Sequence, residues 1–171
     1  MSSSSRIVST SYRHATVALG ELLRITRDGE QGLRMCAIRA ESGSLRTLFT
    51  AMADRYRSAA AELHELIGRI GGDPSMRCVI PGAARRGWVG LHESLALTDD
   101  RALIDDCERA EDHALEVYRN ALDDHLPEFV RQAVLQQFEG LMQDHHRIRL
   151  LGREPHPTGA VVVSYGGHAQ P

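Results

Sequence analysis

The feature of this sequence that most constrains its fold is a three-and-four spacing of apolar residues, repeated in four long segments. The segments run from about residue 16 to 40, 45 to 70, 100 to 122 and 128 to 151. Apolar residues at this spacing line one face of an amphipathic helix, and four such faces bury one another in a bundle. The sequence therefore predicts an all-α protein, folded as an antiparallel four-helix bundle.

The connections between the segments predict the order of the helices. Residues 41–44 (Glu-Ser-Gly-Ser) join the first two helices, with Gly43 a candidate C-cap and Ser44 a candidate N-cap. Residues 71–74 (Gly-Gly-Asp-Pro) end the second helix, and the residues 98–100 (Thr-Asp-Asp) cap the third. The fourth helix starts at residues 126–128 (Leu-Pro-Glu). Two short loops that flank one long crossover are the connectivity of a ferritin-like bundle.

The long crossover, from about residue 73 to 99, contains a further helical signal. Pro81 is placed to open a shorter helix whose apolar side includes Trp88. We expect a domain organisation with a flexible N-terminal segment at residues 1–15, the bundle at 16–151 and a flexible tail at 152–171. The tail is rich in Pro, Gly and His, apart from an apolar run from Val161 to Val163. The Trp88 helix and this tail are the expected contacts for a protein partner, and we also expect a homo-oligomer.

Composition excludes several classes of protein. The net charge of −3 and the pI near 6.3 argue against a nucleic-acid binder. All 20 basic residues are arginine, so a chemistry that depends on lysine is excluded. The three cysteines are widely spaced and form no disulfide framework. Neither a signal peptide nor a membrane span is evident, and we therefore expect a cytoplasmic protein with no membrane partner.

Ionisable residues on the apolar stripes are the candidate functional residues. A buried carboxylate without a partner costs several kcal/mol, whereas carboxylates and an imidazole between helices can bind a divalent metal. The sequence therefore predicts a possible metal site, with iron or manganese preferred to zinc. The candidate ligands are Glu62, Glu108, Glu111 and His145, with Asp28, Glu30 and Glu65 as weaker candidates.

The helix register supports one half of this site and provides alternatives for the other half. Reflection about the loop near residue 125 sets His145 level with residues 106–108, which places Glu108 in reach and Glu111 one turn away. Reflection about the loop near residue 43 sets Glu30 level with Arg55, so an interhelical ion pair explains Glu30 without a metal. For Glu62 the alternative is a pair with arginine or simple exposure. For Glu108, Glu111 and His145 the alternative to a metal site is a buried hydrogen-bonded cluster.

Several stretches resemble a bacterial family of ferritin-like four-helix-bundle proteins of unassigned function, a domain-of-unknown-function family. The resemblance rests on the order and spacing of LLRITRDGEQG (22–32), AEL (61–63), GGDP (71–74), RGW (86–88), ERAED (108–112) and HHRIR (145–149). It implies a ferritin-like fold with the long crossover. It also implies that the shared polar positions of the family fall on Asp28, Glu62, Glu108, Glu111 and His145.

Three functional hypotheses follow. The first is a ferritin-like bundle that binds one divalent metal and acts in stress or metal handling. The second is a structural or regulatory module without metal, which forms oligomers or binds a partner chain. The third is a dinuclear oxidase or peroxide-consuming enzyme, which would need Glu-x-x-His on two helices. In this chain Met142 stands three residues before His145, and Glu65 stands three residues after Glu62.

Overall fold

The computed structural model describes residues 3–74 and 99–153, with side chains from residue 12 onward. The described residues form four helices: α1 (Ser3–Arg39), α2 (Gly43–Arg69), α4 (Asp100–Asp123) and α5 (Glu128–Arg153). These helices confirm the all-α prediction and the four long segments. The crossover helix with Trp88 and the tail with Val161–Val163 lie outside the described residues.

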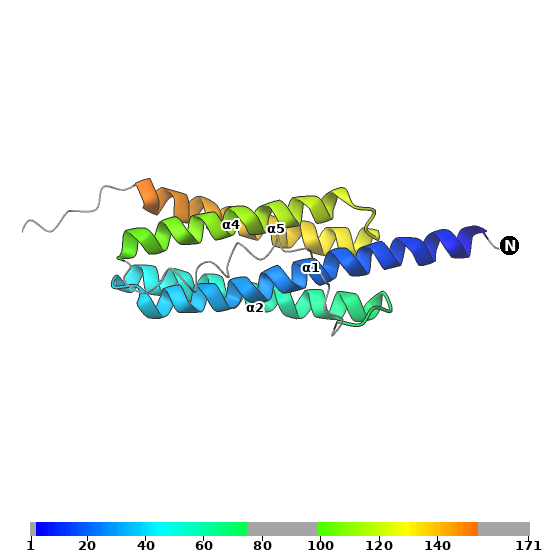
Figure 1. Ribbon diagram of the computed structural model, residues 1–171, viewed down its shortest axis with the longest axis horizontal. Coiled ribbons are helices and arrows are strands. Elements are labelled where there is room, and N and C mark those ends of the chain that lie inside the picture. Colours follow the sequence, from blue (N-terminus) through cyan, green and yellow to red (C-terminus); the bar gives the residue numbers. More distant parts are fainter. Residues whose placement is uncertain (1–2, 75–98, 154–171) are drawn as a thin grey trace, which may run out of the picture.

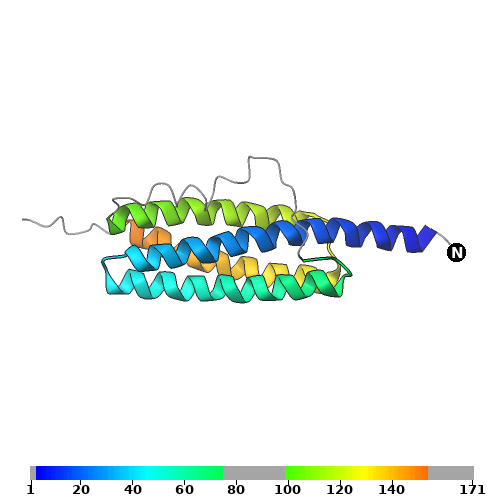
Figure 2. The same cartoon turned by 60° about the horizontal axis from the view of Figure 1, so that its bottom comes forward.

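The four helices lie side by side as an elongated bundle, and their directions follow from the two kinds of connection. Figures 1 and 2 show α1 and α2 as one antiparallel hairpin, and α4 and α5 as another. The end of α2 and the start of α4 lie at opposite ends of the bundle (Figure 1). α4 therefore runs parallel to α2, as a long crossover between them requires.

The N-terminal part of α1 differs from the sequence prediction. We expected a flexible segment up to residue 15, but the helix already begins at Ser3 and projects beyond the ends of the other helices (Figures 1 and 2). The serines at its start have only modest helix propensity, which concealed the helix in the sequence. No glycine or proline interrupts this stretch, so nothing in it prevents the helix of the bundle from extending to Ser3.

The end of α2 is set by backbone geometry at two glycines. Gly71 has φ of +77°, its N–H donates to the carbonyl of Gly68 at 3.0 Å, and the N–H of Gly72 donates to Ile67 at 2.9 Å. These bonds form a Schellman motif, in which the residue after the C-cap takes the left-handed conformation that glycine adopts readily. The predicted termination at residues 71–74 is therefore confirmed.

The helix starts agree with the sequence in one case and differ in another. The side chain of Asp99 accepts a hydrogen bond of 2.9 Å from the N–H of Ala102, as expected of the cap of α4. At α2 the N-cap is Ser42 instead of Ser44, and Gly43 is the first helical residue. The carboxylate of Asp100 accepts from the N–H of Ser42 at 2.9 Å, which ties the first loop to α4.

The apolar faces close three of the four seams of the bundle. The pairs α1 and α2, α4 and α5, and α1 and α4 pack along their lengths, whereas α2 and α5 contact each other sparsely. The largest fully buried side chains are Tyr56, Tyr118, Phe49, Leu19, Leu22, Ile25, Leu33, Met52, Leu63 and Ile67. Among the described helices, α2 and α5 are thus the neighbouring pair whose backbones approach each other least, and we call the gap between them the open seam.

None of the four described helices contains a stretch long and apolar enough to cross a membrane.

Candidate functional site

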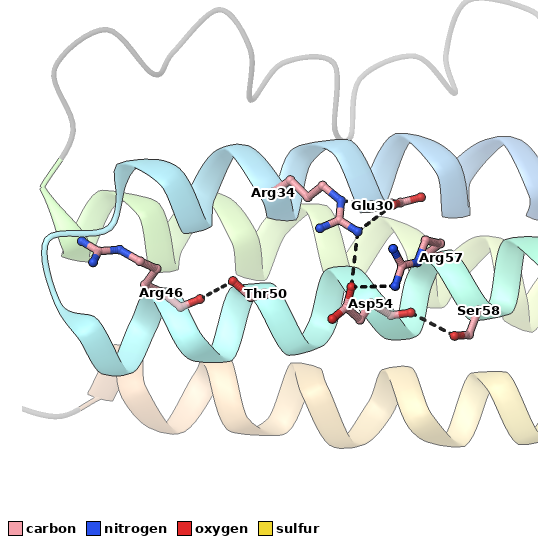
Figure 3. A network of polar contacts seen from close by, with 7 residues as sticks. All are labelled: Glu30, Arg34, Arg46, Thr50, Asp54, Arg57 and Ser58. Carbon is pink, nitrogen blue, oxygen red and sulfur yellow. Dashed lines mark hydrogen bonds and ion pairs between the residues drawn. The ribbon is translucent and has the colours of Figure 1, made fainter.

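Glu30, a weaker candidate ligand, belongs to a surface network between α1 and α2. Its Oε1 lies 3.0 Å from Nη2 of Arg34, and the same nitrogen lies 3.3 Å from Oδ1 of Asp54 (Figure 3). Arg57 approaches this Asp54 oxygen at 3.2 Å (Figure 3). The predicted pair between Glu30 and Arg55 is therefore wrong, because Glu30 pairs with Arg34 on its own helix. Asp54, one residue before Arg55, is the residue of α2 that points toward α1.

Arg55 instead joins α2 to α5 across the sparse seam. Its Nε donates to Oδ2 of Asp144 at 2.7 Å, and its Nη2 donates to the other carboxylate oxygen. The side chain of Asp144 is only 3% exposed. Inside the bundle its charge is neutralised by the guanidinium of Arg55 in a bidentate pair. Sequence reasoning missed Asp144, although it stands three residues after Leu141 and four before Ile148 on the buried stripe of α5.

Glu111 is the most deeply buried acid among the described residues. It is 0% exposed, and its Oε1 accepts a hydrogen bond of 2.7 Å from the hydroxyl of Tyr56. Its Oε2 has no hydrogen-bond partner among the described residues. Burial raises the pKa of Glu111 to about 8, and the negative charge of Asp144 raises it further, while the Tyr56 hydroxyl lowers it. At neutral pH this side chain is mostly a protonated, uncharged acid.

The two described cysteines behave as small apolar residues, as expected. Both are buried and free. Burial raises the pKa of Cys36 to about 12. Burial also raises the pKa of Cys107, and a negative charge on Glu111 raises it further. Neither thiol is therefore a thiolate nucleophile near neutral pH.

The predicted partners of His145 lie elsewhere. His145 Nε2 is 2.8 Å from Oδ1 of Asp112, a contact that is an ion pair when the imidazole is protonated. Glu108 instead pairs with Arg149, at 3.2 Å between Oε1 and Nε. His145 is thus level with Asp112, about one helical turn from the predicted level of residues 106–108.

A chain of hydrogen bonds from α4 through α5 to α2 ends at Glu62. Its first residue is Tyr118 on α4, whose hydroxyl lies 3.1 Å from Oγ1 of Thr26, while the Thr26 hydroxyl donates to the carbonyl of Leu22 at 2.6 Å. Tyr118 donates to Oε1 of Gln137 on α5 at 2.9 Å. Nε2 of Gln137 then donates to Oε2 of Glu62 on α2 at 2.6 Å. The chain begins in the core and fixes the orientation of a carboxylate at the surface.

Glu62 lines a groove of about 430 Å³ along the open seam between α2 and α5. Asp54 and Asp144 also line this groove, but both are paired with arginine. Glu62 takes part in none of the ion pairs formed by the described residues. The groove is lined by Asp54, Arg55, Ser58, Ala59, Glu62, Gln136, Gln137, Gly140, Leu141 and Asp144. It therefore combines one unneutralised negative charge with a small apolar floor.

The structure separates the predicted metal ligands instead of gathering them. Glu62, Glu108, Glu111 and His145 each have a different neighbour, while Asp28 pairs with Arg24 at 2.9 Å. Glu65 is exposed on α2. Within residues 3–74 and 99–153, no three His, Cys, Asp or Glu side chains form a group that could hold a metal ion. Metal binding by these residues stays a prediction.

Comparison with known proteins gives one family. A family model described as "Domain of unknown function (DUF2383)" matches residues 14–124. The match includes most of α1 and all of α2 and α4, and it ends before α5. No curated protein matches the chain.

Proposed function

The chain belongs to the DUF2383 family, whose function is unknown, and we propose that this member is a binding protein for small organic cations. The binding site is the groove between α2 and α5, and Glu62 is the residue that pairs with the positive charge. The ligand class is an alkylammonium ion. The proposal also takes the bundle to be ferritin-like, which the long crossover and the antiparallel hairpins support.

The observation that carries this proposal is the fixed, unneutralised carboxylate of Glu62 in an open groove. A carboxylate held by Gln137 in one orientation loses less entropy when it pairs with a ligand than a mobile surface glutamate does. The groove volume of about 430 Å³ lies within the range of small-molecule sites. Ala59, Gly140 and Leu141 supply apolar surface for a short hydrocarbon chain beside the charge.

One uncommitted carboxylate suits an ammonium ion better than a divalent metal. A metal such as iron or manganese requires several oxygen or nitrogen ligands. In the groove the second buried carboxylate, Asp144, is already held by Arg55. An ammonium group needs only an anion and a few acceptors, and its alkyl chain gains from the apolar floor.

The test is a titration with 1-butylammonium, followed by NMR signals of the ligand. We expect binding with a Kd on the order of 1 mM, which corresponds to about −4 kcal/mol. Glu62→Gln keeps the size of the side chain and removes the charge, so it should weaken binding at least about tenfold. The matched control is Glu65→Gln, an exposed acid on the same helix outside the groove, which should bind like the native chain.

The same titration with 1-butanol separates charge from apolar contact. The neutral alcohol has the same carbon chain and should bind far more weakly. Equal binding of the alcohol and the ammonium ion, or unchanged binding by Glu62→Gln, would refute the proposal.

A divalent metal is the second candidate, and one observation favours it. Oε2 of Glu111 is buried without a hydrogen-bond partner in the described part of the chain, and such an atom is a possible metal ligand. In the described positions this oxygen is isolated, because His145 lies against Asp112 and Asp144 is held by Arg55. The donor set therefore does not fit a metal without rearrangement.

Elemental analysis of protein purified without chelator tests this second candidate. Metal binding predicts about one metal per chain, lost in Glu111→Gln and retained in Glu116→Gln, an exposed acid on the same helix. A metal content near zero in the native chain would exclude it.

A further inference from the structure

The outward side of α5 carries a line of large apolar residues that no described helix covers. Leu135 and Met142 are each 44% exposed, and Leu150 is 49% exposed. They are spaced seven and eight residues apart, so all three lie on one side of the helix, two turns from each other. Burial of these three side chains against a partner would remove their apolar surface from water.

The charged residues on this side change sign along the helix. Glu128 and Glu139 are exposed in the first half, and Arg149 and Arg153 are exposed in the second half. Glu128 precedes Leu135 by seven residues, and Arg149, which also pairs with Glu108 of α4, follows Met142 by seven, so these charges flank the apolar line. We call the set Glu128, Leu135, Glu139, Met142, His146, Arg149, Leu150 and Arg153 the outer face of α5.

The outer face is complementary to itself when a second copy lies antiparallel on it. With the two-fold axis midway between Met142 and Gln143, the Met142 side chains of the two copies lie beside each other. Leu135 then lies opposite Leu150 of the second copy, and Glu139 lies opposite His146. The acidic first half of one helix meets the basic second half of the other. A parallel arrangement would instead place like charges together.

We propose that the chain forms a two-fold symmetric dimer through the outer face of α5. The partner is a second copy because the spacing and the charge pattern both match an isologous, antiparallel contact. This surface differs from the groove, since the groove is lined by Gln137, Leu141 and Asp144 on the other side of the helix. The proposal is therefore independent of the cation site.

Sedimentation equilibrium of the full chain, with Met142→Glu and Ile38→Glu as variants, tests the dimer. We expect the native chain to be a dimer in the micromolar range. Met142→Glu places two negative charges at the two-fold axis and should weaken the dimer at least about tenfold. Ile38 is 74% exposed on α1, so Ile38→Glu is a matched change from apolar to acidic that should leave the dimer unchanged.

A monomeric native chain at high micromolar concentration would overturn the proposal, as would a dimer that Met142→Glu leaves intact. Both variants are at exposed positions, and circular dichroism checks that each is folded. If Met142→Glu fails to fold, the disulfide experiment below decides the proposal by itself.

Disulfide cross-linking tests the antiparallel orientation. In a Cys78→Ser background, Leu135→Cys chains are mixed with Leu150→Cys chains and oxidised mildly; the other cysteines, Cys36 and Cys107, are buried. The antiparallel dimer predicts cross-links in the mixture and few in either variant alone. Cross-links of Leu135→Cys with itself, or none in the mixture, would contradict the proposed contact.

Discussion

At the scale of single residues, the interior of the bundle contains an acid, Glu111, that forms no ion pair with the other described residues. Glu111 is 0% exposed and bonded to Tyr56, and its pKa is raised to about 8 chiefly by burial. Asp144, on the neighbouring helix, is instead paired with Arg55, which donates to both of its oxygens. Two neighbouring buried acids are thus accommodated in two ways, one by protonation and one by an ion pair.

The raised pKa of Glu111 makes the stability of the native chain depend on pH. Its ordinary value is 4.5, and the folded value is about 8, so between these values the folded state holds a proton that the unfolded state has lost. The stabilisation is complete below pH 4.5 and is lost as the pH rises to about 8, with a slope of about 1.4 kcal/mol per pH unit.

We therefore expect Glu111→Gln to flatten this dependence. Urea unfolding at pH 5 and pH 8 should show the native chain losing stability relative to the variant as the pH rises, because the neutral amide has no proton to release. Glu65→Gln, at an exposed position, should follow the native chain. If the free energies of unfolding of Glu111→Gln and the native chain differ by the same amount at both pH values, Glu111 is ionised in the folded state.

The individual contacts were harder to predict than the buried positions. The sequence placed Glu111 and His145 on buried stripes. Glu111 is 0% exposed, and the side chain of His145 is 13% exposed. Asp144 and Gln137 stand on the stripe of α5 as well, so their spacing could have revealed them. The partners depend on helix rotation: a difference of one residue directs Asp54 and Arg55 to different helices.

At the scale of the elements, backbone rules at the helix ends act as strongly as the apolar stripes. α2 ends in a Schellman motif in which Gly71 takes a positive φ, whereas a Cβ atom added at Gly68, in the last turn, would meet only open space. These two glycines in one turn therefore have opposite roles. Gly71 is needed for the geometry, and Gly68 lowers helix stability without a packing reason.

This contrast gives a matched pair of substitutions. Gly71→Ala should lower the free energy of unfolding by about 1 kcal/mol, because an alanine is strained at φ of +77°. Gly68→Ala should raise it by up to about 1 kcal/mol, since alanine is the better helix former. Thermal unfolding of both variants measures the two changes. Changes of the same sign would show that the end of α2 is not fixed as described.

The elements themselves were largely predictable because their apolar period, caps and terminators agree. Asp99 marks the start of α4, and the glycines at 71 and 72 mark the end of α2. The start of α1 was not predictable in this way, since its run of serines offers several equivalent N-cap candidates and is followed by few apolar residues.

At the scale of the whole molecule, three closed seams and one open seam determine where a ligand can bind. The sequence predicts the four apolar faces, but it cannot show which pair of helices fails to close, because that depends on crossing angles and side-chain volumes along the whole bundle. The open seam between α2 and α5 holds the groove, and the chain of hydrogen bonds from Tyr118 through Gln137 to Glu62 connects three helices to reach it.

The most direct test of the account is to map where an alkylammonium ion binds. Amide chemical shifts of the labelled chain are recorded during a titration with 1-butylammonium. The account predicts shifts confined to α2 around Ala59 and Glu62 and to α5 around Gln137 and Leu141, and their loss in Glu62→Gln. Shifts that map elsewhere on the bundle, or no shifts at saturating ligand, would contradict it.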